Sequence, residues 1–327
     1  MAKNQITAVQ LKPYLIECGY RPSLIDPGTA LLGGRHAAWT AFAHVPLDMR
    51  SACISAIDGL TDSQNDAAAC KDLGAPITFV CFQDRFEWWK QSSGEPIWLE
   101  TIPAQRASQF FQKYKEVFAP DAIYRAKTWG RVDTHHQLTF VDLGLMPLVE
   151  EEAGKRIEQL LARNVSELKK HLDWSDITQQ QGKWLLQSVF WLLAAKVLRD
   201  KNVPKFKNAD LADVPAIFDL VADHYGTKER LVPQGPKERS GLVAIASDIQ
   251  QFADLGMLTT EALAYVYEQA LIGKETRAKL GTHSTPTFLI DYILGNLAPW
   301  IKEIPLSEHF VHRTISSKKA FREVISL

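Results

Sequence analysis

Acidic residues in the first part of the chain are of the type that a Mg²⁺-dependent nuclease uses. That chemistry needs two or three carboxylates and a lysine around the metal ion, on neighbouring strands. The candidates are Asp48, Asp58, Asp84, Glu87 and Glu100. No Glu-x-Lys with an apolar middle residue falls on an expected strand, since Glu87 and Lys90 stand one residue too far apart. From these residues alone, a live Mg²⁺ nuclease and plain surface charge are both open interpretations.

Three further groups of residues could bind a ligand. His135 and His136 follow Asp133, but adjacent side chains on a strand point in opposite directions, so we expect no metal there. Asp121 and Lys127 lie in a segment that could be helical. An aromatic hairpin could stack on bases, although packing in the core is the favoured interpretation. The hairpin group consists of Trp88, Trp89 and Trp98, with Arg85, Lys90 and Arg106 nearby.

A basic loop later in the chain is the candidate contact with DNA phosphates. It carries Lys228, Arg230, Lys237 and Arg239 beside Gly235 and Pro236. Lysine and arginine provide such contacts, whereas a solvated loop is the alternative.

The run Gly281–Ile293 predicts a capped helix. Thr285 is a suitable N-cap, and Pro286 fits the first helical position, where its missing N–H costs nothing. The N-terminus of such a helix can hold a carboxylate or phosphate, because its free N–H groups carry partial positive charge. A purely structural helix start is the alternative.

A longer pattern surrounds this turn. Tyr265-Val266-Tyr267-Glu268 is followed by Arg277, Gly281 and Thr285-Pro286. The pattern resembles the entry to the catalytic domain of the N6-adenine DNA methyltransferases of restriction–modification systems, in particular the type IIG and Eco57I-like group. The resemblance covers about residues 150–312 and is strongest over 265–293; residues 194–201 resemble the helix that precedes the turn in that group.

The resemblance implies a cofactor, S-adenosylmethionine, and a set of residues that touch its methionine part. These residues are Gly281, His283, Ser284, Thr285 and Pro286. At Ser284 the family usually has an aromatic residue. The family also implies transfer of a methyl group to adenine N6 in DNA, in defence against phage. Type IIG proteins often carry a nuclease at the position of the first domain, so the resemblance implies a nuclease-like scaffold there, which we expect to lack a working site.

Two motifs that the family needs next do not occur in these 327 residues: a Gly-rich acidic loop and Asn-Pro-Pro-Tyr/Phe. The first lets backbone approach the cofactor, and the second holds the flipped adenine. We therefore expect the N-terminal and helical part of such an enzyme, truncated, split, frameshifted or expressed as a fragment. We assign it no catalytic residues and expect it to bind no cofactor alone. A separately encoded methyltransferase or specificity chain is an expected partner, and a non-enzymatic DNA-contact or subunit-docking module is an alternative function.

The hydrophobic pattern predicts an α+β protein. We expect a mixed α/β domain over 1–148, an all-helical domain over 149–300, and a truncated start of a methyltransferase domain over 301–327. Expected strands are 39–45, 52–57, 77–82 and 138–142, with a hairpin formed by 86–90 and 95–100. Expected helices include an amphipathic one with Ile157, Leu160, Leu161, Val165, Leu168 and Leu172 on one stripe, a central one over 182–199, and one that begins at Thr259.

Composition narrows the class and the compartment. The net charge is −1, from 37 Lys+Arg and 38 Asp+Glu, so a strongly basic nucleic-acid binder is excluded for the chain as a whole. No apolar run approaches the roughly 20 residues that span a bilayer. Cys18, Cys53, Cys70 and Cys81 lack metal-site spacing, and we expect buried free thiols in a cytoplasmic protein without membrane contact.

Overall fold

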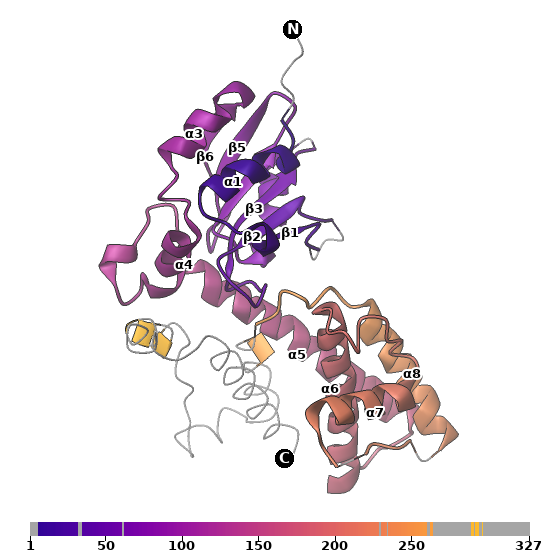
Figure 1. Ribbon diagram of the computed structural model, residues 1–327. Helices are drawn as coiled ribbons and strands as arrows, with labels where there is room; N and C mark the ends of the chain where they lie inside the picture. Colours follow the sequence, from indigo (N-terminus) through magenta and orange to yellow (C-terminus); the bar gives the residue numbers. More distant parts are fainter. Residues whose placement is uncertain are drawn as a thin grey trace. The chain divides into compact units, whose positions relative to one another are not determined.

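Figure 1 shows the computed structural model of the chain, coloured along the sequence. It describes residues 6–31, 35–60, 62–228, 230–233, 235–259, 262–263, 289–290, 292–293 and 296. The fold is α+β, as predicted, because a mixed sheet with flanking helices precedes a run of longer helices.

The described residues fall into two compact units. The first unit comprises the residues up to Gly154 together with those that follow from Met257, and the second comprises Lys155–Gly256. The predicted boundary after residue 148 and this division both lie within one helix, α5 (Leu145–His171). The predicted segment 301–327 lies outside the described residues.

The first unit is built on a six-stranded sheet in which the strands follow one another in chain order. The strands are β1 (Ile25–Pro27), β2 (Trp39–Phe42), β3 (Ala52–Asp58), β4 (Ile77–Cys81), β5 (Arg85–Lys90) and β6 (Ile97–Pro103). All neighbouring pairs are antiparallel except β3 and β4, which are parallel. A parallel pair needs a crossover, and α2 (Ser63–Ala69) lies in the connection between these two strands.

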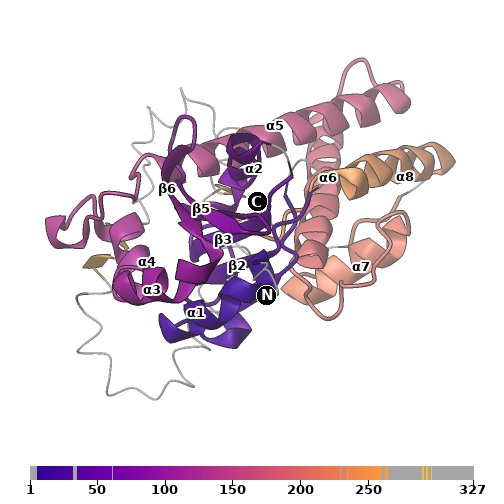
Figure 2. The same ribbon diagram turned by 90° about the horizontal axis from the view of Figure 1, so that it is seen from above.

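Apolar residues cover both faces of this sheet, so it forms the middle layer of the unit (Figure 2). On one face lie α1 (Lys12–Glu17), α3 (Ala107–Lys113) and α4 (Pro120–Trp129). On the other face, α2 and the short 3₁₀ turn Lys71–Leu73 cover a smaller cluster.

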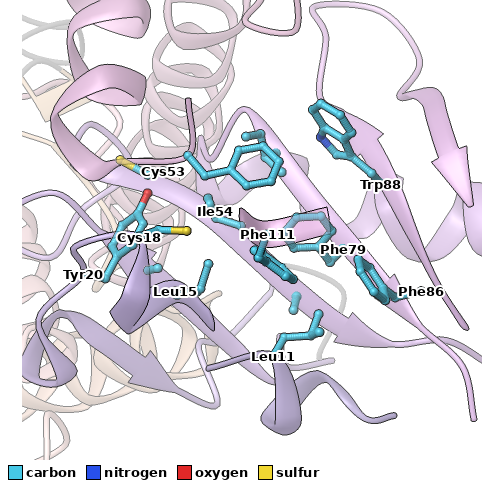
Figure 3. Packing of buried hydrophobic residues seen from close by; sticks show 14 of the residues in the cluster. Leu11, Leu15, Cys18, Tyr20, Cys53, Ile54, Phe79, Phe86, Trp88 and Phe111 are labelled. Atoms are coloured by element: carbon cyan, nitrogen blue, oxygen red, sulfur yellow. The ribbon is translucent and has the colours of Figure 1, made fainter. Parts of the chain in front are cut away.

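Aromatic rings dominate the larger cluster (Figure 3). The ring of Phe79 on β4 lies 5.6 Å from that of Phe86 on β5 and 5.5 Å from that of Phe111 on α3, both in edge contacts. Phe118, which precedes α4, contacts Phe79 and Trp88 in the same way. Edge-to-face pairs are favourable beyond the area they bury, so this cluster fixes α3 on the sheet.

Most of the predicted strands form where they were expected. The predicted runs 39–45 and 77–82 contain β2 and β4, the run 52–57 covers β3 except for its last residue, and the predicted hairpin is β5–β6. The strand predicted over 138–142 is wrong, because that segment is a turn in which the Val141 amide donates to the Leu138 carbonyl at 2.9 Å. Its apolar residues are buried against the aromatic cluster without a strand partner, and a short apolar run alone does not distinguish these outcomes.

The described residues of the second unit form four helices (Figure 1). They are α5, of which the unit takes the part from Lys155, α6 (Gln179–Asp200), α7 (Val214–Tyr225) and α8 (Pro236–Gln251). The predicted stripe of α5 is buried except for half-buried Val165. α6 contains the predicted central helix and packs against α7 and α8, and it starts at a capping box between Thr178 and Gln181.

The helix predicted to begin at Thr259 is described only at its start, in the first unit. Thr259 Oγ1 accepts a hydrogen bond from the Ala262 amide at 3.2 Å, which is the predicted N-cap contact.

Candidate functional site

The residues expected to touch S-adenosylmethionine lie outside the described residues. These are Gly281, His283, Ser284, Thr285 and Pro286. Tyr292, a few residues further along, is described, and its ring meets the ring of Trp129 on α4 edge-on at 6.0 Å.

Four of the five candidate Mg²⁺ carboxylates are engaged with hydrogen-bond donors or cationic groups of the protein. Asp48, in the loop before β3, accepts hydrogen bonds from the amides of Arg50 and Ser51. Asp58, at the end of β3, accepts one from the Ala8 amide at 2.8 Å. Both therefore hold the chain at the ends of β3.

The remaining acids lie on separate elements. Glu87, in the middle of β5, accepts from Trp89 Nε1 at 3.2 Å and faces Arg85 Nε at 3.6 Å. Asp84 pairs with Arg85, Asp121 pairs with Arg125, and Glu100 is exposed on β6. Within the described ranges, no three His, Cys, Asp or Glu side chains come together as a metal site.

Lys127, on α4, is buried and braces the chain just before β3. Its ammonium Nζ donates to the carbonyls of Met49 and Ala52 at 2.6 and 2.8 Å. Burial lowers the pKa of Lys127 to about 8, against the opposing effect of nearby Cys53, Asp48 and Glu150. This lysine is therefore directed at main-chain oxygens in the interior and takes a structural role.

The two adjacent histidines lie in a 3₁₀ turn and not on a strand, and their side chains make different contacts. Asp133 caps the 3₁₀ turn Thr134–His136 by accepting from the His135 amide at 2.9 Å. His136 Nδ1 lies 2.8 Å from Asp133 Oδ2, whereas the His135 side chain is exposed. The His135 amide is the main cause that lowers the pKa of Asp133. The trio is a capped turn.

The aromatic hairpin divides into a buried and an exposed part. Trp88 and Trp89 on β5 are buried, as the favoured interpretation predicted. Trp98 on β6 is 52% exposed, and its Nε1 donates to Thr101 Oγ1 at 3.2 Å. Only Trp98 is thus placed to meet a ligand.

The predicted basic loop joins α7 to α8 in the second unit, and two of its cations have carboxylate partners. Arg230 Nη2 lies 2.7 Å from Asp223 and its Nε lies 3.7 Å from Asp219. Lys237 Nζ lies 2.8 Å from Asp173.

The other two predicted cations of this loop are exposed. Lys228 lies in the loop and Arg239 in the first turns of α8, and neither side chain has an ion pair with a residue in the described part of the chain.

A second basic segment, which the sequence interpretation missed, joins α6 to α7. We name Arg199, Lys201, Lys205 and Lys207 the α6–α7 basic patch. The nearest acid in sequence, Asp200, is occupied because its carboxylate lies 2.8 Å from Lys196 Nζ and accepts from the Leu255 amide at 2.8 Å. Burial raises the pKa of Asp200, against the effect of Lys196. Local charge bias was the available signal, with five cations and one acid over 196–207.

All four cysteines are free and buried, as predicted. Burial raises the pKa of Cys18 and Cys53 to about 11 and that of Cys70 to about 12. Across the described residues, no helix has both the length and the apolar character needed to cross a membrane. Comparisons of the chain with models of protein families, with curated proteins and with solved structures find no match.

Proposed function

We propose that this chain is the N-terminal and helical part of a restriction–modification DNA adenine-N6 methyltransferase, in the cytoplasm, and that it contributes DNA contact rather than methyl transfer. The observation that carries the proposal is the run from Tyr265 to Pro286, with its Gly-x-x-x-Thr-Pro ending. An α+β unit followed by helices is the arrangement that we expect ahead of such a turn.

The motifs present and absent in these 327 residues indicate which steps this polypeptide would take part in. The Gly-rich loop and the Asn-Pro-Pro-Tyr/Phe motif are not among these 327 residues, so polypeptide beyond them, in the same chain or another, would bind the adenosyl group and the flipped adenine. S-adenosylmethionine would supply the methyl group in that assembly.

DNA contact is proposed for the exposed cations of the second unit. Lys228 and Arg239 are free to meet phosphates, whereas Arg230 and Lys237 must first leave Asp223 and Asp173. Phosphate contacts of this kind give affinity without sequence choice and weaken as salt rises.

The test combines two measurements on the full chain. Fluorescence anisotropy with a labelled DNA duplex should show binding that weakens with salt, and Lys228→Gln/Arg239→Gln should reduce the slope of log affinity against log salt by up to about 2. Radiolabelled S-adenosylmethionine should give no methylated DNA with this chain alone, and N6-methyladenine once polypeptide carrying both missing motifs is added. Absence of duplex binding at low salt, or methyl transfer to any other position in the assembled enzyme, would refute the proposal.

A further inference from the structure

In the α6–α7 basic patch, Lys205 and Lys207 carry positive charge that no ion pair with a described residue compensates. Between residues 196 and 207 the single carboxylate belongs to Asp200. Asp200 and Lys196 form a buried pair, with side chains 8% and 7% exposed. The next acid along the chain is Asp210, at the approach to α7.

The backbone holds this patch in a defined conformation. α6 ends at Asp200, and Asn202, two residues later, lies in the left-handed region with φ of 54°. The Val203 amide closes the helix end by donating to the Leu198 carbonyl at 3.0 Å. The next turn is closed by the Phe206 amide, which donates to the Val203 carbonyl at 2.8 Å. The loop is thus hydrogen-bonded along its length, and binding need not order it.

The buried ring of Phe206 anchors the loop segment that carries Lys205 and Lys207. Phe206 is fully buried, and its ring meets that of His224 on α7 edge-on at 5.4 Å. Lys205 and Lys207 flank it in sequence and are both exposed, and neither has an ion pair with a described residue. Phe206 therefore anchors the loop while its two neighbours present their ammonium groups to solvent.

The dipole of α6 explains only part of the patch. Cations near a helix C-terminus are stabilised without any ligand, and the effect falls off within the last turn. That accounts for Arg199 and for Lys201, whose Nζ also donates to the Gly256 carbonyl at 3.0 Å. Lys205 and Lys207 lie beyond the helix end and gain nothing from this effect.

The α6–α7 basic patch differs in its ion pairing from the predicted basic loop between α7 and α8. There, contact with phosphate competes with the carboxylates that hold Arg230 and Lys237. At the α6–α7 basic patch, Lys205 and Lys207 would exchange only water and counterions for phosphate, which is the favourable source of nucleic-acid affinity.

From this arrangement we infer that the α6–α7 basic patch is a contact surface for the phosphodiester backbone of duplex DNA, with Lys205 and Lys207 as its principal groups. The contact is independent of base sequence, because lysine meets phosphate as a point charge. The inference rests on the proposed function and adds to it a second contact, separate in sequence from Lys228 and Arg239.

The experiment compares three full-length proteins with a labelled DNA duplex over a range of salt concentrations. Lys205→Gln/Lys207→Gln should lower the magnitude of the slope of log affinity against log salt by about 2, because two phosphate contacts are lost. Lys113→Gln/Lys115→Gln removes the same charge from exposed positions at the end of α3 and should leave the slope of the unmodified chain. Thermal unfolding of all three controls for folding.

The possible outcomes distinguish failure of this inference from failure of the proposed function. Duplex binding by the unmodified chain with the same slope in Lys205→Gln/Lys207→Gln would overturn the inference and leave the proposed function standing. No duplex binding by the unmodified chain would overturn both. Equal slopes together with a fall in melting temperature for the Lys205→Gln/Lys207→Gln variant would show a structural role for the lysines. Anionic phosphatidylserine vesicles serve as a second probe: binding to them that depends on these lysines, without duplex binding, would assign the patch to a lipid surface instead.

Discussion

The two units differ in how several of their charged residues are used. In the first unit, Lys127 and Asp66 are directed into the fold: Lys127 donates to two carbonyls, and buried Asp66 accepts from the Leu60 amide and from Arg35. In the second unit, Lys205 and Lys207 point to solvent. Lys127, a candidate functional residue of the first unit, is therefore part of its architecture, whereas the cations proposed to contact DNA lie in the second unit.

The largest effect is expected from Phe111→Ala. Phe111 is almost fully buried and contacts rings from α1, β4, β5 and the α3–α4 region, so its loss should cost about 4 kcal/mol of unfolding free energy. Hydrogen exchange should show lost protection in the sheet and retained protection in α6–α8, if the units unfold separately. Equal loss of protection in both units would show that they unfold as one.

Lys127→Ala should cost about 3 kcal/mol, since it leaves the Met49 and Ala52 carbonyls without their buried donor and opens a cavity. Urea unfolding measures this cost. Lys115→Ala, an exposed position after α3, is the matched control and should change stability by less than about 0.5 kcal/mol. A comparable small change at both lysines would contradict the bracing role.

The contribution of Lys127 should also depend on pH. Its pKa is lowered from 10.5 to about 8 in the folded protein, so above pH 8 the folded state releases a proton that the unfolded state keeps. This term therefore raises stability with pH, by about 1 kcal/mol between pH 8 and 9. The measurement is the stability of the unmodified chain minus that of Lys127→Met at each pH.

The stability of Lys127→Met is subtracted because the buried thiols change stability with pH in the direction opposite to Lys127. Burial raises the pKa of Cys53 to about 11 and of Cys70 to about 12, so unfolding releases their protons above about pH 9 and lowers stability there. A difference curve that is flat or falls between pH 8 and 9 would contradict the assignment to Lys127.

The smallest effect is expected at an exposed pair. Asp223→Asn removes the partner of Arg230, and because both side chains are well exposed the cost should stay below about 0.5 kcal/mol. The same change leaves Arg230 with only the longer, 3.7 Å contact to the Asp219 carboxylate, so the magnitude of the salt slope of duplex binding should increase by up to about 1. A large loss of stability would mean that the pair holds α7 to the loop.

Periodicity and turn chemistry predicted most of the fold. The hairpin β5–β6, the stripe on α5 and the cap at Thr259 were foreseen because each depends on local residue types. The run 138–142 was assigned wrongly because its burial comes from distant aromatic residues, which local pattern does not contain. Likewise, the pairing of Arg230 with Asp223 and of Lys237 with Asp173 follows from helix packing, so sequence could identify the cations but not which of them stay free.

The buried position of Lys127 has a practical consequence. With a pKa of about 8, the Lys127 amine is half neutral at that pH and could react with an acylating reagent, yet its burial and its contacts with the Met49 and Ala52 carbonyls keep reagents away from it. Acylation at this one site should then proceed only when α4 leaves the sheet. The rate of its modification, followed by peptide mass spectrometry, would report how often the first unit opens under native conditions.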